Sequence, residues 1–403
     1  MRIIVIGGGP AGMISAYISA TQNNQVTLIE KNEKLGKKLY ITGKGRCNLT
    51  NDCDVEEFFT NVVTNKKFLM SALYGFTPND TKELFTKFGL KLKTERGNRV
   101  FPESDKSSDV IKCMAKMLAS VGVNVILNQN VTSLIVENNE CLGVTTQNGD
   151  IFADKIIVAT GGISYSSTGS TGDGYEFAKS VGHTVVQPVA GLSAMLTKPK
   201  YPNLAGLSLK NVTLKVYYED KFLRGEFGEM LFTHEGISGP IVLTLSSYIN
   251  RLDLSKVKLY IDFKPALDEQ TLDNRILRDF EKVNTKQLKN AFDALLPQRI
   301  IDVFLDSLEI NKEKKVCELS KQDRKKIVNI MKNFPLGKIR LSPIEEAIIT
   351  SGGISTKEIN PKTMQSKLVK NLYFAGEVID VDALTGGFNI QIALATGVQA
   401  GKE

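Results

Sequence analysis

Three glycines near the N-terminus, Gly7, Gly9 and Gly12, follow a run of apolar residues and precede a segment with the pattern of a helix. A second apolar run ends at the acidic residue Glu30. Glycines at this G-x-G-x-x-G spacing let the chain turn tightly, let the backbone approach a pyrophosphate, and let a helix pack closely against a strand. A carboxylate after the second strand accepts hydrogen bonds from a ribose. These residues therefore predict a dinucleotide-binding turn.

The elements around these residues have the order that such a turn requires. Residues 3–6 are typical of a buried parallel strand, residues 13–20 have the pattern of a helix, and residues 26–29 predict a second strand. The pyrophosphate would lie at the N-terminus of the helix, where free N–H groups and the helix dipole favour an anion. Glu30 would repel a 2′-phosphate, which disfavours NADP here, but this stretch alone does not distinguish FAD from NAD.

The bulk composition is that of an ordinary soluble protein. Hydrophobic residues make up 42% of the 403 residues and charged residues 24%, which suits two or three globular domains. No apolar run approaches the roughly 20 residues of a membrane span, and the apolar N-terminus is too short for a signal peptide. The five cysteines form no C-x-x-C pair, and only two histidines occur. We therefore expect a cytoplasmic protein with reduced thiols, no metal site and no membrane segment.

The net charge of +7 is compatible with two kinds of partner. It permits contact with nucleic acid, and it equally suits an anionic cofactor or an acidic substrate. Lysines concentrate around residues 312–332, but acidic residues alternate with them there. We interpret that segment as a solvated helix face rather than as a nucleic-acid site.

Residues 31–52 are polar and rich in lysine and glycine, and they begin directly after the acidic residue that ends the second strand. Gly43 and Gly45 allow a close approach of the backbone to a ligand, because neither carries a Cβ. Lys44 and Arg46 offer cations to a phosphate or to a reduced flavin. The sequence therefore predicts a loop that contacts the cofactor, and a basic surface loop is the alternative.

The rest of the first half predicts a helical stretch and more of the sheet. Residues 54–120 are mostly helical by their apolar spacing, and residues 123–152 have the alternation and turns of a small antiparallel meander. Residues 155–162 form a second buried strand that runs into glycines. We expect this strand in the same parallel sheet, with Thr160 and Gly161 near the cofactor.

The character of the chain changes after residue 191. Strand-like alternation follows over about 192–265, and helical patterns with charged faces follow over about 266–335. Glycine-rich segments that resemble a ligand site return from about residue 341. We therefore predict an inserted domain over 192–340 between two parts of one nucleotide-binding domain.

The C-terminal part contributes a second set of glycines. Residues 371–377 predict a buried strand that ends in Gly376 and Glu377, and residues 384–391 open a final helix of small residues. A helix entered through glycines presents free N–H groups, which suit the electron-rich O2/N1 edge of a reduced flavin. The two ends of the chain are therefore expected to build one site.

Three separated pieces together resemble one superfamily of flavoproteins. The N-terminal turn with its acid, the strand end at 159–161 and the strand at 373–377 are similar to the FAD-binding pieces of the two-dinucleotide-binding-domain flavoproteins related to glutathione reductase. More narrowly, the chain is identified as a member of the YhiN/BaiN-like flavoproteins, FAD-dependent oxidoreductases that include proteins named as aminoacetone oxidases and a bile-acid enone reductase. The stretches that carry this resemblance span nearly the whole chain: residues 41–51, 101–104, 169–174, 230–240, 375–380 and 385–389.

The resemblance implies an α/β fold in which a Rossmann-like FAD-binding domain is split by an insert with a β-barrel-like part and a small helical part. It implies FAD as the cofactor. A second G-x-G-x-x-G after a strand does not occur in the sequence, so NADH or NADPH, as a transient donor, would dock in an open cleft. The residues assigned to FAD are Gly7, Gly9, Pro10, Ala11, Gly12, Glu30, Lys31, Lys38, Gly43, Gly45, Arg46, Cys47, Asn48, Val131, Ala159, Thr160, Gly161, Gly376, Glu377, Gly387, Asn389 and Ile390.

The family also implies hydride transfer through flavin N5 to or from a small or planar organic substrate. A reductase needs a proton donor and a cation that stabilises developing enolate charge. Arg46 is our candidate cation. His234 is our candidate acid or base, with a loop-stabilising histidine as the alternative. Tyr165 is a further candidate donor, and a packing role is equally compatible with its position.

Three classes of function therefore remain open from the sequence. The first, which we favour, is a flavin oxidoreductase acting on a small or planar molecule. The second is a flavoprotein that acts on RNA, as in tRNA modification. A basic stripe leading into the flavin site would support this class, and scattered lysines would argue against it. The third is a non-catalytic FAD-binding electron carrier. The sequence carries no signal for an oligomeric state.

Overall fold

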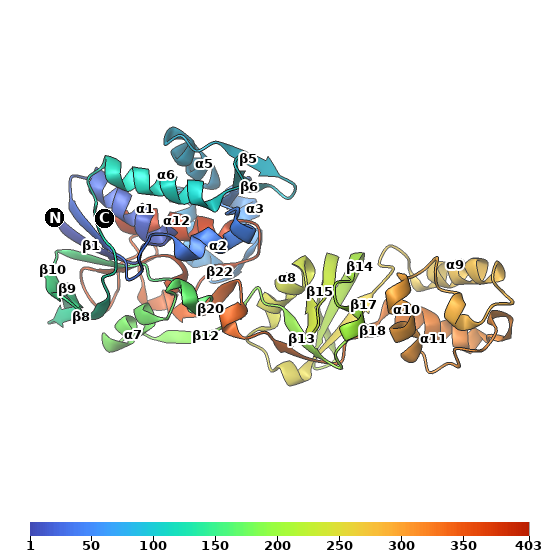
Figure 1. The fold of residues 1–403 in the computed structure, drawn as a ribbon. Helices are drawn as coiled ribbons and strands as arrows, with labels where there is room; N and C mark the ends of the chain where they lie inside the picture. Colours follow the sequence, from blue (N-terminus) through green and yellow to red (C-terminus); the bar gives the residue numbers. More distant parts are fainter. Residues whose placement is uncertain (403) are drawn as a thin grey trace. The chain divides into compact units, whose positions relative to one another are not determined.

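A parallel sheet begins at the N-terminus and is completed by a strand near the C-terminus, β21 (Leu372–Phe374) (Figure 1). The computed structural model describes residues 1–402. In spatial order the five strands of the sheet are β21, β11 (Lys155–Val158), β1 (Arg2–Ile6), β2 (Gln25–Ile29) and β7 (Asn124–Ile126). Four of these five strands are mainly apolar and almost fully buried, so they form the centre of the first core cluster, whereas the edge strand β7 is partly exposed.

One helix packs directly on this sheet, and two more pack against that helix. Helix α1 (Pro10–Thr21) contacts β1, β2 and β11, and helix α12 (Phe388–Gly401) lies against α1. Their close approach depends on glycine, because a Cβ at Gly397 would lie 2.6 Å from the carbonyl oxygen of Ala11. Helix α6 (Ser107–Ser120) packs against α1 from another side. The first and last helices of the chain therefore meet beside the first strand.

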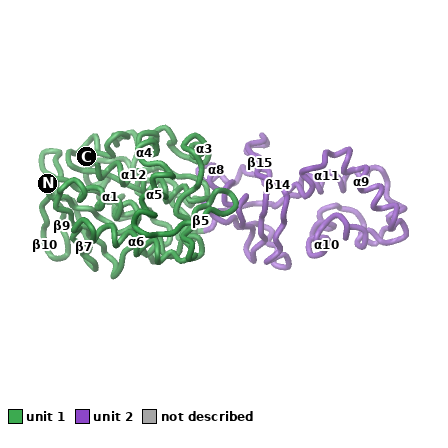
Figure 2. Tube along the Cα trace, turned by 90° about the horizontal axis from the view of Figure 1, so that it is seen from above, with its two compact units in different colours: residues 1–191, 343–403 green, residues 192–342 purple. Residues whose placement is uncertain are grey.

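The chain divides into two units, coloured green and purple in Figure 2. Unit 1 contains residues 1–191 together with the C-terminal segment that begins at Pro343, and unit 2 is Leu192–Ser342. The expected split of the nucleotide-binding domain by an insert is confirmed as the fold class. The second boundary lies two residues after the position that we predicted.

The segment between β2 and β7 differs from the prediction in two respects. Residues 31–52 contain a helix, α2 (Lys37–Gly45), although its backbone leaves helical geometry at Thr42, Gly43 and Lys44. Residues 54–120 contain the expected helices, but they also contain an antiparallel hairpin that we did not predict, formed by β5 (Leu92–Glu95) and β6 (Arg99–Pro102). Strands are recognised in a sequence by the alternation of apolar and polar residues, and a strand of four residues with few apolar side chains is too short to show it. The remaining elements there are β3 (Thr50–Asn51), α3 (Val55–Thr60), β4 (Val62–Thr64), α4 (Met70–Gly75) and α5 (Pro78–Lys87).

A three-stranded antiparallel meander and two smaller sheets complete unit 1. The meander follows β7, as predicted, and its middle strand contacts β11. Strand β12 pairs with β20, which joins the end of the N-terminal part of unit 1 to its C-terminal part. The elements are β8 (Val131–Glu137), β9 (Glu140–Thr146), β10 (Gly149–Phe152), α7 (Asp173–Ser180), β12 (Val185–Gly191), β20 (Ile349–Ile354) and β22 (Asp382–Ala383).

Unit 2 has its own core, built from an antiparallel sheet and a group of helices. The sheet has seven strands, β18-β17-β14-β15-β16-β13-β19, and helix α8 (Pro240–Ile249) packs on β15. Phe263 and Phe304, with ring centroids 6.2 Å apart, join the sheet to the helices. The other elements are β13 (Met195–Lys198), β14 (Ser208–Tyr218), β15 (Lys221–Phe232), β16 (Gly236–Ser238), β17 (Val257–Asp262), α9 (Glu269–Glu281), α10 (Gln298–Asp306), α11 (Lys321–Lys332), β18 (Phe334–Pro335) and β19 (Lys338–Leu341).

None of the helices in residues 1–402 combines the length and the apolar character that crossing a bilayer requires.

Candidate functional site

The three glycines of the N-terminal turn have three different surroundings. Gly7 has a φ of +106°, and a Cβ there would lie 2.6 Å from the carbonyl oxygen of Ala159 at the end of β11. A Cβ at Gly12 would lie 1.9 Å from the carbonyl oxygen of Gly7. A Cβ at Gly9 would meet no atom within 4 Å. Gly7 and Gly12 are therefore required by the protein itself, whereas Gly9 leaves open space at the N-terminus of α1, where a pyrophosphate would lie.

The carboxylate of Glu30 is held against this turn by backbone donors. The backbone N–H of Gly8 donates to Oε2 at 2.7 Å, and the backbone N–H and side-chain amide of Asn32 both donate to Oε1 at 2.7 Å. Glu30 is buried. Its position is thus fixed in advance, which is the arrangement that ribose recognition by an acidic residue requires. Asn32 was not predicted, and its place two residues after Glu30 is the only signal that would have indicated it.

Two buried side-chain oxygens of the predicted FAD residues have no hydrogen-bond partner among residues 1–402. These are Oγ1 of Thr160, just after β11, and Oδ1 of Asn48, just after the turn that ends α2. Buried polar atoms are normally hydrogen-bonded, so two unpaired atoms of this kind mark a place for ligand atoms. Both residues belong to the set that we predicted for FAD. The residues present therefore fit this cofactor.

A lysine–glutamate pair joins the two ends of the chain. Nζ of Lys38 donates to Oε2 of Glu377 and to Oγ of Ser164, both at 2.7 Å. The backbone N–H of Thr350 donates to the other carboxylate oxygen of Glu377 at 2.9 Å. Sequence reasoning missed Thr350, whose only signal was its place before the glycine pair Gly352-Gly353 in strand β20. The network fixes Glu377 directly after Gly376, a position where φ is +79°.

The N-terminus of α12 is shaped by glycine and by one asparagine. A Cβ at Gly387 would lie 2.4 Å from the carbonyl oxygen of Thr50, so only glycine permits this approach. The amide of Asn389 accepts from the backbone N–H of Ala383 at 2.9 Å and donates to its carbonyl oxygen at 2.7 Å. The side chain of Asn389 therefore orders the preceding turn. Any contact of this residue with FAD would come from its backbone, and that contact stays a prediction, as it does for Ile390.

The predicted adenine end lies beside the meander. The backbone N–H of Gln129 donates to the carbonyl oxygen of Glu30 at 3.1 Å, which brings the start of β8 next to the end of β2. Val131 is buried there. Lys31 is already engaged, because its ammonium contacts the carboxylate of Asp173 at 2.6 Å. A phosphate-binding role for Lys31 would require it to leave that carboxylate.

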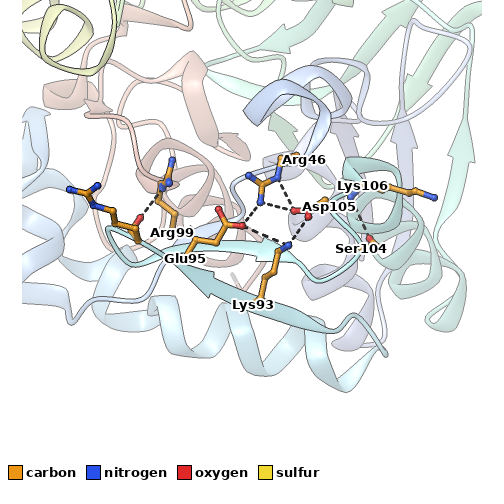
Figure 3. Close-up of polar contacts among 8 residues, drawn as sticks. Arg46, Lys93, Glu95, Arg99, Ser104, Asp105 and Lys106 are labelled. Atoms are coloured by element: carbon orange, nitrogen blue, oxygen red, sulfur yellow. Dashed lines mark hydrogen bonds and ion pairs between the residues drawn. The ribbon is translucent and has the colours of Figure 1, made fainter. Parts of the chain in front are cut away.

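Arg46, our candidate catalytic cation, belongs to a cluster of four charged side chains (Figure 3). Its guanidinium donates to Oδ1 of Asp105 at 2.7 Å, contacts Glu95, and lies 4.1 Å from the centre of the Phe101 ring. Lys93 also contacts Asp105, at 2.6 Å. The hydrogen bond from Arg46 lowers the pKa of Glu95, and those from Lys93 and Arg46 lower the pKa of Asp105. Two cations and two anions thus compensate one another, and the catalytic role of Arg46 stays a prediction.

Cys47 follows Arg46 and is fully buried with a φ of +57°. Burial raises the pKa of its thiol to about 12. At neutral pH the group is therefore a neutral thiol, which suits packing beside a cofactor and not nucleophilic chemistry. Gly45, two residues before it, leaves open space where a Cβ would project.

The remaining catalytic candidates lie in two separate places. Tyr165 belongs to unit 1, is half-buried, has a φ of +53°, and donates its backbone N–H to the carbonyl oxygen of Glu345 at 3.1 Å. His234 is exposed in the turn between β15 and β16 of unit 2. The other histidine, His183, is buried, with ring nitrogens 3.2 Å from Glu358 and 2.7 Å from Ser366, and burial lowers its pKa. A neutral, hydrogen-bonded His183 has a structural role.

A match to a protein family identifies the family to which the chain belongs. The family described as the HI0933-like protein Rossmann domain matches residues 1–403. The chain belongs to this family. The predicted membership of the YhiN/BaiN-like flavoproteins is thereby confirmed. This family consists of FAD-dependent oxidoreductases.

Two curated proteins resemble the HI0933-like chain over almost its full length. A 3-dehydro-bile acid delta(4,6)-reductase of Clostridium scindens is 29% identical, covering 100% of this chain and 98% of that protein. A ribosomal RNA dihydrouridine synthase of Haemophilus influenzae is 28% identical, covering 97% of this chain and 95% of that protein.

Among solved structures, a 3-ketosteroid delta1-dehydrogenase of Sterolibacterium denitrificans covers 99% of this chain and 98% of its own, with a TM-score of 0.50 and 14% identity. At that identity the likeness concerns the fold alone.

Proposed function

We propose that this protein is an FAD-dependent reductase of a carbon–carbon double bond that is conjugated with a carbonyl group in a planar ring, and that the ring is a uracil within RNA. The observation that carries the reaction type is that the two curated relatives, one named for a bile acid and one for ribosomal RNA, share this chemistry. Dihydrouridine is uridine with its C5=C6 bond reduced, and that bond is conjugated with the C4 carbonyl. Both reactions are thus reductions of an unsaturated carbonyl compound.

The reaction adds one hydride and one proton across the double bond. The hydride goes to the carbon β to the carbonyl, the proton goes to the α-carbon, and a reduced nicotinamide dinucleotide, NADH or NADPH, is oxidised in balance. FAD, when bound, supplies the hydride chemistry. Its adenosine would be held by Glu30 and the N-terminal turn, and its flavin half by Lys38, Glu377 and the N-terminus of α12.

The protein's own groups must bind the ring and deliver a proton. Arg46 is proposed to stabilise negative charge on the carbonyl oxygen, which requires it to exchange one of its two carboxylate partners for the substrate. Tyr165 and His234 are retained as candidate proton donors to the α-carbon. Each of these roles is open to test by substitution in the holoenzyme.

The distribution of charge supports RNA as the substrate. Residues 87–116 contain eight basic and four acidic residues, so this segment carries +4 of the net charge of +7. It includes hairpin β5–β6, whose residues Lys93 and Glu95 share the cluster of Arg46. Basic residues therefore outnumber acidic ones next to the predicted flavin loop, as they also do over residues 312–332, which hold eight basic and three acidic residues. The first of these two segments supports an RNA-directed enzyme, because it adjoins the predicted flavin loop. A ribosomal RNA substrate would place the reaction in the cytoplasm.

A free steroid-like enone is the second candidate substrate, because the bile acid reductase matches the whole chain. A steroid-like acid carries a single negative charge and needs no extended basic surface, so an extended surface of this kind favours RNA. The same protein acting only as an electron carrier would be reduced by a donor and reoxidised by oxygen or by a redox partner, without any unsaturated carbonyl compound.

The test is an anaerobic half-reaction with the purified holoenzyme. NADH or NADPH is added until the visible absorption of the flavin is bleached, and the reduced enzyme is mixed with uridine-containing RNA or with a 3-oxo-Δ4 steroid. We expect RNA to restore the flavin absorption and to gain two hydrogen atoms per modified uridine by mass spectrometry. An RNA in which dihydrouridine replaces uridine is the matched control. Reoxidation by the steroid alone would overturn RNA as the substrate in favour of the second candidate, and failure of both compounds to reoxidise the reduced flavin would overturn the reaction type as well.

A further inference from the structure

A hollow of about 560 Å³ lies on unit 1, away from the glycine turn. Its volume is within the roughly 300–1,000 Å³ range of ligand pockets. We call it the basic groove, and it is lined by Phe88, Gly89, Leu90, Lys91, Glu103, Ser104, Asp109, Lys112, Cys113 and Lys116. Three of these residues are lysines, two are acidic and one is aromatic, so the lining has a net positive charge and an aromatic surface, which suit phosphate and base together.

The walls of the basic groove are fixed by hydrogen bonds and packing. The backbone N–H of Glu103 donates to the carbonyl oxygen of Lys91 at 2.9 Å, which closes the base of hairpin β5–β6. Nζ of Lys116 donates to the carbonyl oxygen of Phe88 at 3.3 Å, so α6 is tied to the end of α5. The Phe88 ring packs edge-on against Tyr17, with centroids 5.6 Å apart. The groove is therefore a preformed feature.

Most of the positive charge around the groove is uncompensated. Of the basic residues between 87 and 116, Lys93 pairs with Glu95 and Asp105, and Lys112 lies 3.7 Å from Asp109. Within the described part of the chain, six others form no ion pair: Lys87, Lys91, Arg96, Arg99, Lys106 and Lys116. Figure 3 shows Arg99 and Lys106 on either side of the self-compensated cluster of Arg46.

We infer that the basic groove and the adjoining hairpin β5–β6 bind the sugar–phosphate backbone of an RNA strand that flanks the target uridine, an inference that rests on the proposed function. Lys91 and Lys116 would contact phosphates, and Phe88 offers an aromatic surface to a base or ribose. Contacts to the backbone position a nucleic acid without reading its sequence, so a site of this kind holds the strand while the catalytic site selects the base.

The chain connects this groove directly to the predicted flavin loop. Glu103 and Ser104 line the groove, and the next residue, Asp105, is the partner of Arg46. Arg46 in turn lies within the loop that we assign to FAD. A strand lying in the groove would thus pass along the hairpin toward the site of reduction.

The surface chemistry favours RNA over an anionic membrane. A peripheral membrane site combines basic residues with apolar or aromatic residues that insert into the bilayer. None of the large hydrophobic residues that are exposed within residues 1–402 lies between 87 and 116. A hollow with cations on its rim also fits a strand better than it fits a flat surface.

The experiment compares two triple variants of the FAD-loaded protein. The groove variant is Lys91→Glu, Arg96→Glu and Lys116→Glu, and the control variant, Lys286→Glu, Lys321→Glu and Lys325→Glu, changes charge equally on exposed lysines of unit 2. Binding of a fluorescein-labelled, uridine-containing RNA hairpin is followed by anisotropy over a series of salt concentrations. Flavin absorption and thermal unfolding verify that each variant is folded and loaded.

We expect the groove variant to bind the RNA at least 10-fold more weakly than the wild type, and the slope of log K against log salt to fall by about two, since about 0.7–0.9 counterions are released per phosphate contact. A neutral variant, Lys91→Gln, Arg96→Gln and Lys116→Gln, should show a smaller loss in the same direction. The control variant should bind within about twofold of the wild type.

Equal loss in the groove and control variants would overturn the inference, because binding would then follow net charge alone. Tighter binding to anionic phospholipid vesicles than to RNA would overturn it in favour of a membrane site. The proposed reaction fails separately: if the wild type binds RNA through the groove but RNA does not reoxidise the reduced flavin, the surface stands and the reductase assignment falls. If RNA reoxidises the flavin of the wild type and of the groove variant at equal rates and binds both with equal affinity, the proposed reaction stands and the proposed RNA-binding groove is wrong.

Discussion

The glycine turn and the basic groove, the two ligand sites that we propose, are built in opposite ways. At the turn, atoms of the protein leave no alternative to glycine: a Cβ at Gly12 would lie 1.9 Å from a carbonyl oxygen, and Glu30 is held by three N–H donors. At the groove, backbone contacts only set the walls, and the ligand-binding groups are flexible lysines such as Lys91 and Lys116. The first site is specified by steric exclusion and the second by the accumulation of charge.

This difference determines how substitutions act. A larger side chain at the turn either clashes with protein atoms, as at Gly7 and Gly12, or enters the space assigned to the ligand, as at Gly9. A change at the groove alters affinity in proportion to charge and salt and leaves the fold intact. Substitutions that separate folding from binding are therefore the sharpest tests of the comparison.

The largest expected effect distinguishes two glycines of the same turn. Gly12→Ala places a methyl group against the carbonyl oxygen of Gly7, and overpacking of this kind costs at least about 1–3 kcal/mol of unfolding free energy. Gly9→Ala meets no protein atom within 4 Å, and its backbone, with φ of −80° and ψ of −177°, suits alanine. We expect G12A to lower the melting temperature of the FAD-free protein and G9A to leave it unchanged or slightly raised.

Binding of FAD completes this test. The methyl group of Gly9→Ala enters the space assigned to the pyrophosphate, so G9A should be a folded protein that retains little flavin after gel filtration. If G9A bound FAD like the wild type, the pyrophosphate would not lie at this turn.

The next effect concerns Glu30. In Glu30→Gln one carboxylate oxygen becomes an amide, so one of the N–H donors from Gly8 and Asn32 loses its acceptor. The hydrogen bond that we assign to the ribose loses its charged acceptor as well, and loss of a hydrogen bond to a charged group costs about 1.5–3 kcal/mol, which is roughly 10–100-fold in FAD affinity. Isothermal titration of the FAD-free variant measures this loss. Glu33→Gln, at an exposed carboxylate three residues later, is the control and should have no effect on FAD binding.

These two sites also mark how far the sequence alone could lead. Gly7, Gly9, Gly12 and Glu30 were found because their spacing along the chain is itself the requirement of the turn. Most of the fold was predicted for the same reason. Apolar runs predict buried strands, and the final helix shows apolar residues at helical spacing, so both can be recognised from neighbouring residues alone.

Other features depend on residues that are far apart in sequence. Thr350 reaches Glu377 only through the folded sheet, and Asp105 meets Arg46 only because β5–β6 folds back on the loop after α2. The hairpin itself was missed because its four-residue strands carry little periodic signal. The basic groove brings together the end of α5, the base of the hairpin and α6, and a lysine count along the chain pointed instead to residues 312–332.

A smaller effect is expected at the cluster that lies between the two sites. The pKa values of Glu95 and Asp105 are lowered in the folded protein by their hydrogen-bonded cations. A carboxylate with a lowered pKa stabilises the fold above its unfolded pKa of about 4, and this contribution is lost as the pH falls through the folded pKa. Arg46→Ala removes one of these cations, so its melting temperature should fall less than that of the wild type when the pH is lowered from 7 to below the folded pKa values of the two carboxylates.

Activity then separates the two roles of Arg46. If the side chain stabilises the substrate carbonyl, Arg46→Ala and Arg46→Lys should both lower kcat, by about 10–1,000-fold for the alanine variant, because an electrostatic contribution of this kind is worth several kcal/mol. If it only joins the hairpin to the flavin loop, Arg46→Lys should restore kcat by preserving the ion pairs. A normal kcat in Arg46→Ala would remove the residue from the chemistry.

The smallest effects use one cysteine from each site as a reporter. Burial raises the pKa of Cys47, in the flavin loop, to about 12 and that of Cys113, in the lining of the basic groove, to about 11, whereas Cys317 is exposed. Only thiolate reacts with alkylating agents, so at pH 8 Cys317 should be modified rapidly and the other two slowly. Peptide mass spectrometry gives each rate, and Cys317→Ser should abolish the fast phase.

Ligands should then protect the two slow thiols selectively. FAD is expected to slow the modification of Cys47 and to leave Cys113 unchanged, and RNA is expected to slow Cys113 alone. Both rates should rise with pH in the absence of ligand, because the thiolate fraction rises. Protection of Cys113 by FAD, or of Cys47 by RNA in the FAD-free protein, would mean that the turn and the groove respond to one ligand together and are not two independent sites.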